Sequence, residues 1–184
     1  VTDPVNPAPL PMLKVDEPTL TMNFCVNTSP LAGREGKYVT SRQIWDRLQR
    51  ELQHNVALRV SETGEEGVFE VMGRGELHLT ILLENMRREG YELAVSKPRV
   101  VFRDVGGERH EPIELVTADI EEQHQGGVMQ ALGERKGDLV NMEPDGRGRV
   151  RLEYRIPARG LIGFSNEFLN LTRGSGLISN IFDS

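Results

Sequence analysis

Short segments in which apolar and polar residues alternate are separated, along most of the chain, by segments with helical spacing. Residues 19–27 read TLTMNFCVN, in which alternate positions carry Leu, Met, Phe and Val. This period of two predicts a strand with one buried face. Thr40 and Gln43 then have the spacing of a capping box, and apolar residues recur at helical spacing to about residue 54. A strand followed by a helix is therefore expected at the start of the patterned region.

Two more strands, a second helix and a fourth strand complete this first unit. Strands over residues 57–62 and 68–73 are separated by a turn rich in Gly and Glu, which predicts a hairpin. The second helix is expected to begin at Gly75 and to end at Gly90, because glycine is typical of the position after a helix. A strand over residues 91–96 follows. The apolar face of the second helix is expected to contain Leu77, Ile81, Leu82 and Met86.

The same order of strands and helices recurs in the second half of the chain. Arg-Gly precedes the second helix of each unit, as Arg74-Gly75 and as Arg159-Gly160. Two consecutive β-α-β-β-α-β units predict the α+β class, with two tandem ferredoxin-like (split βαβ) domains. Each domain is expected to be a four-stranded antiparallel sheet with two helices on one face. The second unit's elements are expected over residues 113–121, 127–136, 138–143, 149–156, 160–174 and 177–181, after a linker over 97–112 in which residues 99–104 add an edge strand.

Composition limits the kinds of protein that this chain can be. The 184 residues are 38% hydrophobic, which is enough for two small cores. The formal net charge of -6 excludes a polycation that coats nucleic acid without selection, so any RNA contact has to come from a local patch. A single cysteine, Cys25, excludes an internal disulfide. Since no stretch approaches about 20 apolar residues, we expect a cytoplasmic protein without a membrane span.

No residue pattern in the chain predicts catalysis or a metal site. The phosphate-binding string GxxxxGK[ST] of nucleotide hydrolases does not occur. Residues 104–107 match DxxG, but four residues without the phosphate loop favour a plain turn. The four histidines are not spaced as metal ligands. We therefore expect no catalytic residue, no cofactor-binding residue and no metal ligand in this chain.

The strongest polar feature is a row of arginines along the strand predicted near residues 147–156. The arginines alternate with apolar residues, so one face of the strand is cationic and the other is apolar. The cationic face predicts either contact with phosphate groups or a solvated surface with cross-strand ion pairs. No aromatic residues accompany the arginines on that face, which argues against base stacking. The candidate contact residues are Arg147, Arg149, Arg151 and Arg155, with Arg159 and Arg173 extending the patch.

Four longer strings give the chain a family resemblance. Residues 73–79 read GRGELHL, residues 157–164 read PARGLIGF, and residues 171–176 read LTRGSG. A loop over residues 27–37 reads NTSPLAGREGK. The first string and the tandem units resemble domains III and V of translational GTPases of the elongation factor G class. The other strings are more similar to the BipA (TypA) family of these GTPases, and the resemblance covers nearly the whole chain.

The resemblance implies a domain organisation. Residues 1–17 would be the tail of a preceding β-barrel domain. Residues 18–97 would be the ferredoxin-like unit similar to domain III, and residues 98–174 would be the unit similar to domain V. Residues 175–184 would contain the last strand and the start of a truncated C-terminal domain. The chain would then be a piece of a longer protein.

The resemblance also implies a function. The longer protein would bind GTP and Mg through an N-terminal GTPase domain that lies outside this chain. It would bind the ribosome, through both rRNA and ribosomal proteins, and act in translation, 50S subunit assembly and the stress response. This chain would supply surfaces for ribosome docking and for coupling to the protein's own GTPase and β-barrel domains, without hydrolysing GTP.

Two other classes of function remain as alternatives. A ligand-sensing regulatory module is the main one, because paired βαββαβ domains that bind amino acids place the ligand at helix starts and Gly-rich loops. Binding of a small amino acid in calorimetry would favour it. A small hydrolase of the acylphosphatase kind would need an arginine-lined phosphate loop joined to an asparagine, and the sequence contains no clear match.

Overall fold

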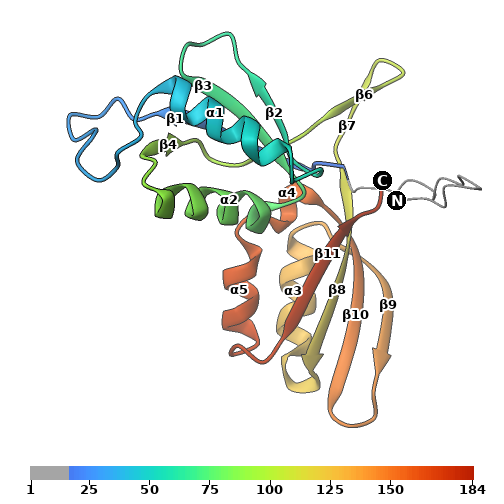
Figure 1. The fold of residues 1–184 in the computed structure, drawn as a ribbon. Helices are drawn as coiled ribbons and strands as arrows, with labels where there is room; N and C mark the ends of the chain where they lie inside the picture. The colour runs from blue at the N-terminus through green and yellow to red at the C-terminus, as the bar shows by residue number, and fades with distance from the viewer. Residues whose placement is uncertain (1–16) are drawn as a thin grey trace, which may run out of the picture.

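The computed structural model describes residues 17–184 and contains two large sheets, each with helices on one face (Figure 1). The first sheet has the strand order β2-β3-β1-β4, and β5 pairs with the end of β1 that β4 leaves free. Every pairing in this sheet is antiparallel. The first unit consists of β1 (Leu20–Val26), α1 (Ser41–Leu52), β2 (Arg59–Glu62), β3 (Val68–Gly73), α2 (Glu76–Glu89), β4 (Leu93–Val95) and β5 (Arg99–Val100).

The second sheet has the strand order β11-β8-β10-β9, which repeats the order of the first sheet when strands are counted within each unit. Both units therefore have the topology of the ferredoxin-like fold, and the predicted fold class is confirmed. No helix within residues 17–184 is long and apolar enough to cross a membrane. The second unit consists of β8 (Ile113–Glu121), the short 3-10 helix η1 (Glu122–His124), α3 (Gln125–Glu134), β9 (Asp138–Pro144), β10 (Arg149–Pro157), α4 (Ala158–Leu161), α5 (Phe164–Leu171) and β11 (Leu177–Phe182).

Helices α1 and α2 begin and end at the residues that the sequence singles out. The Thr40 hydroxyl accepts a hydrogen bond from the Gln43 backbone N–H, and Gln43 Oε1 accepts one from the Thr40 N–H at 3.1 Å. The capping box is therefore present. Gly90 follows α2 with a φ of 94°, in the left-handed region that glycine adopts without strain.

The buried face of α2 differs from the predicted one. Leu79, Leu82 and Met86 face the first core. The sequence places Leu77 and Ile81 on the same face, but these side chains are 72% and 51% exposed. The prediction is wrong because apolar residues are so dense in this helix that they form more than one stripe. Packing selects one stripe, and the other faces the second unit.

The linker between the units forms a projecting hairpin. Only the two residues of β5 pair with β1, so the predicted edge strand over residues 99–104 is too long. β6 (Arg103–Val105) and β7 (Glu108–His110) pair with each other and project beyond both sheets (Figure 1). The Asp104 side chain accepts a hydrogen bond from the Gly107 N–H at 3.0 Å, so the DxxG string forms the predicted turn.

The second unit buries the apolar face of β10 in a core that includes α3 and α5. Val150, Leu152 and Tyr154 are almost fully buried, as their alternation predicts. The single helix predicted over residues 160–174 is instead two short helices, α4 and α5. Gly163 separates them with a φ of 70°, a backbone conformation that breaks the helix and that other residues rarely adopt.

Candidate functional site

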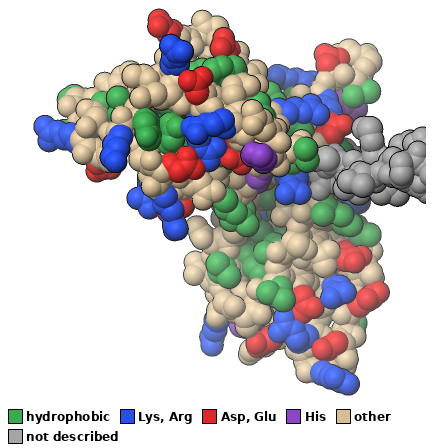
Figure 2. Space-filling view, viewed as in Figure 1, with side chains coloured by type: hydrophobic (Ala, Val, Ile, Leu, Met, Phe, Trp, Pro, Cys, Tyr) green, Lys and Arg blue, Asp and Glu red, His purple; other side chains and the backbone are tan. Residues whose placement is uncertain are grey.

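The candidate arginines of β10 lie on the face of the second sheet opposite its helices. Arg149 Nε donates to Asp119 Oδ1 at 2.7 Å, and an Arg151 nitrogen lies 3.6 Å from Asp119 Oδ2. Arg155 forms an ion pair with Asp183. Figure 2 accordingly shows acidic and basic side chains intermixed over the lower unit. The sequence left open two interpretations of the arginine row: contact with phosphate groups, or a solvated surface with cross-strand ion pairs. The observed ion pairs are of the kind expected for a solvated surface.

The other three candidates are held differently. Arg159 is the second residue of α4, and its Nε donates to Glu111 Oε2 at 2.7 Å. Arg147 lies in the turn between β9 and β10, close in sequence to the arginine row. Arg173 follows α5 in the helical layer, so the structure does not align it with that row. Within residues 17–184, neither Arg147 nor Arg173 forms an ion pair.

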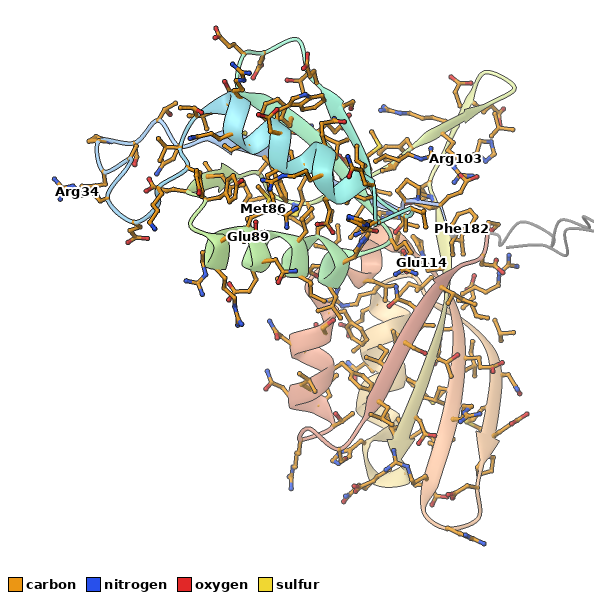
Figure 3. The ribbon with its side chains drawn as sticks, viewed as in Figure 1. Arg34, Met86, Glu89, Arg103, Glu114 and Phe182 are labelled. Atoms are coloured by element: carbon orange, nitrogen blue, oxygen red, sulfur yellow. The ribbon has the colours of Figure 1, made fainter. Side chains whose placement is uncertain are left out.

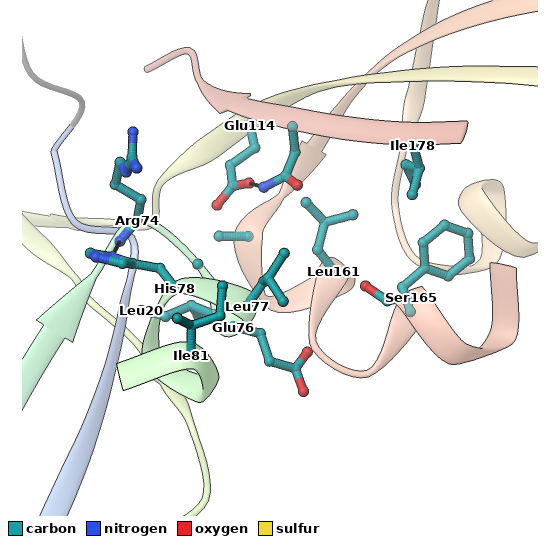
Figure 4. Close-up of a pocket in the computed structure, with 14 residues that line it drawn as sticks. Leu20, Arg74, Glu76, Leu77, His78, Ile81, Glu114, Leu161, Ser165 and Ile178 are labelled. Carbon is teal, nitrogen blue, oxygen red and sulfur yellow. Dashed lines mark hydrogen bonds between the residues drawn. The ribbon is translucent and has the colours of Figure 1, made fainter. Parts of the chain in front are cut away.

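The two Arg-Gly segments meet at the seam between the units. The Gly163 backbone N–H donates to Glu76 Oε2 at 2.9 Å, which joins the α4–α5 turn to the start of α2. Ile162 packs against the apolar cluster of the first unit, and α4 lies against β5. Leu77 on α2 lies opposite Leu161 (Figure 4). Two strings that are far apart in the sequence therefore form one interdomain contact.

His78 fixes the Arg74-Gly75 segment from the first turn of α2. Its Nδ1 accepts a hydrogen bond from the Arg74 backbone N–H at 3.2 Å, so a neutral ring carries its proton on Nε2, which lies 3.1 Å from Asn55 Oδ1 and 2.9 Å from Asn55 Nδ2. Burial lowers the pKa of His78, and the positive charge of Arg74 lowers it further. The neutral ring thus has a structural role at the seam.

A cavity of about 460 Å³ lies in the same seam. Figure 4 shows side chains from both units around it. Its walls combine apolar side chains with a few polar groups from α2, β8 and β11. The most buried of these is Glu114, whose side chain accepts a hydrogen bond from the Asn180 amide and which is only 2% exposed. No sequence pattern pointed to this residue.

A second feature that the sequence did not predict is the support of the loop over residues 27–37. Glu92 Oε1 accepts hydrogen bonds from the Asn27 side chain at 2.7 Å and from the Gly33 N–H at 2.9 Å. Its Oε2 accepts from the N–H groups of Glu35 and Gly36, each at 3.1 Å. The Gly33 hydrogen bond is the largest of the effects that lower the pKa of Glu92. One carboxylate therefore organises the whole loop.

The loop carries exposed side chains away from the first unit. Arg34 lies at the far tip in Figure 3, and Leu31 is 59% exposed. The loop is the string NTSPLAGREGK that contributes to the family resemblance.

Comparisons with known proteins give the chain a family. Residues 108–184 match the family model described as Elongation factor G C-terminus. The large ribosomal subunit assembly factor BipA of Salmonella typhimurium is 66% identical over 99% of this chain and 30% of that protein. This chain belongs to the BipA family. The BipA of Haemophilus influenzae is also 66% identical, over 94% of this chain and 28% of its own, and that of Buchnera aphidicola is 58% identical over 99% and 30%.

The BipA relatives are much longer than this chain, which spans about 30% of their length. A solved structure of a protein from Thermus thermophilus has a TM-score of 0.56 over 95% of this chain and 41% of its own. Its sequence identity is 14%, so it supports the fold alone. The family that the strings suggested is therefore confirmed, and the strings over residues 73–79 and 157–164 meet at the seam.

Proposed function

We propose that this chain is part of a cytoplasmic, ribosome-associated GTP-binding protein of the BipA type, which acts in assembly of the large ribosomal subunit and in the stress response. Within that protein the chain supplies docking and coupling surfaces. The proposal rests on the 66% identity over 99% of the chain to proteins named large ribosomal subunit assembly factor BipA. The activity of the relatives is assigned to the longer protein by inference, because this chain spans about 30% of their length.

GTP and its Mg belong, in this proposal, to the part of the longer protein outside this chain. The sequence has no phosphate-binding loop of the GxxxxGK[ST] kind. Within residues 17–184 no group of three or more His, Cys, Asp and Glu side chains could hold a metal ion. We therefore assign no step of GTP hydrolysis to these residues.

The seam supports the coupling role. It is held by the Glu76–Gly163 hydrogen bond and by the packing of Ile162 on the first core. Because both contacts join one unit to the other, a movement of the first unit displaces α4 and the second unit with it. Partner domains of the longer protein, the GTPase and the β-barrel, would act on the second unit through this connection.

The arginine surface supports the docking role, with unequal contributions from its members. Arg149, Arg155 and Arg159 already have carboxylate partners at hydrogen-bond distance, so a phosphate has to compete for them. Arg151 has only the longer contact to Asp119, and Arg147 has no ion pair within residues 17–184. We infer that these two make the strongest contacts to rRNA phosphates.

Sedimentation with purified ribosomal subunits tests the proposed function. The chain is expected to sediment with the large subunit and to remain in the supernatant with the small subunit. A BipA protein of full length serves as the positive control. If the full-length protein sediments with the large subunit and the chain never does, these two units are spacers and the docking proposal is wrong.

A further inference from the structure

We propose that the cavity in the seam between the two units is a binding site for a small molecule that carries a protonated amino group on an apolar body. The inference goes beyond ribosome association and does not depend on it. It rests on one carboxylate, on the walls around that carboxylate and on the size of the space.

The carboxylate of Glu114 is buried at the wall of the cavity. Only 2% of the residue is exposed, and the hydrogen-bond partner found for it within residues 17–184 is the neutral amide of Asn180. Glu114 takes part in no ion pair within residues 17–184. Burial of a carboxylate is costly unless a cation or several donors compensate the charge. A bound ammonium group, with three N–H donors, supplies that compensation.

One oxygen of Glu114 is available for this role. The Asn180 amide donates to Oε2. Within the described part of the chain, no buried side-chain oxygen or nitrogen atom lacks a hydrogen-bond partner. Within residues 17–184 no hydrogen bond to Oε1 is found, and Glu114 lines the cavity. In Figure 4 the carboxylate points from β8 into the space between the units.

The remaining walls fit an apolar body. Leu77 and Ile81, the stripe of α2 that the first core leaves uncovered, form one wall. Leu161 and Phe164 from the α4–α5 segment, with Ile178 from β11, form the opposite wall. The volume of about 460 Å³ lies within the usual range for small-molecule sites. The cavity therefore combines the Glu114 carboxylate with apolar walls, and Glu76, whose carboxylate already accepts from the Gly163 N–H, and Arg74 also line it. An amphipathic amine is complementary to the Glu114 end and to the apolar walls.

The position of the cavity gives such a ligand a mechanical effect. Its walls come from α2 of the first unit and from β8, α4, α5 and β11 of the second. A molecule in the cavity contacts both units at once and favours the arrangement in which they are closed on each other. Arg74 also lines the cavity, so an amine that carries a carboxylate, as an amino acid does, has a second point of attachment.

Calorimetry on the 184-residue chain with hexylamine tests the site. Hexanol and hexanoate are matched probes that keep the apolar body but remove or reverse the charge. At about pH 7, where a primary amine is protonated, hexylamine is expected to bind saturably and at least about tenfold more tightly than hexanol. Leucine serves as the zwitterionic probe. Equal binding of hexylamine and hexanol, or no binding of hexylamine, would overturn the proposal.

Two variants locate the binding and one controls for it. Glu114→Gln keeps an acceptor for Asn180 but removes the charge, and is expected to weaken hexylamine binding by about tenfold or more. Glu121→Gln, at the other end of β8, is expected to leave binding unchanged. Leu77→Trp places a larger side chain at the cavity wall. Because Leu77 is 72% exposed, this variant is expected to fold, and it should lose hexylamine binding. It therefore tests the site even if Glu114→Gln does not fold. Unchanged binding in Leu77→Trp contradicts the proposal.

Discussion

At the scale of single residues, two side chains tie segments together across long stretches of sequence. Glu92 gathers four donors from the loop over residues 27–37. Arg47 is 9% exposed and links α1 to the end of α2, because its guanidinium donates to Glu89 at 2.6 and 2.7 Å and to Glu51 at 2.9 Å. Each of these charged groups holds backbone segments in place through several directed hydrogen bonds.

Acidification should release the loop that Glu92 holds. Its hydrogen bonds keep the pKa of Glu92 below the ordinary value, so the contribution of the carboxylate is complete above the ordinary glutamate pKa of about 4.3 and is lost as the pH falls through the lowered pKa. The Gly33 amide resonance in NMR should therefore titrate with a midpoint below about 4.3. Glu92→Gln should abolish this titration. A midpoint at or above the ordinary value would show that the loop is not held in this way.

Arg47→Met should destabilise the first unit. The change leaves Glu89 and Glu51 without their common partner, and we expect the free energy of unfolding in urea to fall by about 1–2 kcal/mol, since Glu89 is partly solvated. Arg88→Met is the matched control, because Arg88 pairs with Glu84 on the surface and is 74% exposed. Its effect should stay within about 0.5 kcal/mol. Equal losses in both variants would contradict the role of Arg47.

At the scale of elements, close approach of backbone segments explains one glycine of the family strings. A Cβ added at Gly160, in α4, would lie 2.7 Å from the Arg135 carbonyl oxygen and 3.1 Å from two Ile156 side-chain carbons. The backbone oxygen cannot move without shifting the end of α3. Glycine at this position therefore allows α4 to pack closely, which places the following residues at the seam.

Two Gly→Ala substitutions should change stability in opposite directions. Gly160→Ala should lower the free energy of unfolding by about 1–3 kcal/mol through overpacking. Gly126→Ala, in α3, meets no atom within 4 Å and should raise stability by about 0.5–1 kcal/mol, because alanine favours the helix. Thermal or urea unfolding of both variants measures this. Stabilisation by Gly160→Ala would mean that α4 is not packed as described.

Local signals explain which elements could be predicted from the sequence. The Thr40 capping box, the Gly90 stop and the alternation along β10 each lie within a few residues, and the structure confirms all three. The buried face of α2 could not be predicted, because Leu77 and Leu79 are equally apolar and only tertiary packing separates them. The break in the last helix depends on the backbone conformation of Gly163, which an apolar pattern does not report.

The candidate site was predictable only in part, for the same reason. The alternation places the arginines of β10 on one face, but their partners come from elsewhere in the chain: Asp119 from β8 and Asp183 from beyond β11. The contact between Glu76 and Gly163 spans 87 residues. Each string that forms the seam was visible in the sequence, whereas their meeting is a property of the folded chain.

At the scale of the whole molecule, two ferredoxin-like units are joined at a seam, and the second carries a row of arginines, most of them paired with carboxylates. The units repeat a topology, but their exposed surfaces differ. The first presents the loop organised by Glu92, and the second presents the arginine row. Ribosome docking, if it uses the row, should be electrostatic and should depend on salt, because phosphate contacts release counterions.

The most direct test of docking is the affinity of the chain for the large ribosomal subunit as salt is varied. We predict that binding weakens with salt, and that Arg147→Gln with Arg151→Gln lowers both the affinity and the slope of log K against log salt, the slope by about one per lost phosphate contact. Arg155→Gln, whose wild-type side chain is paired with Asp183, should change the slope less. Binding that is absent, independent of salt or unchanged in the double variant would contradict the account.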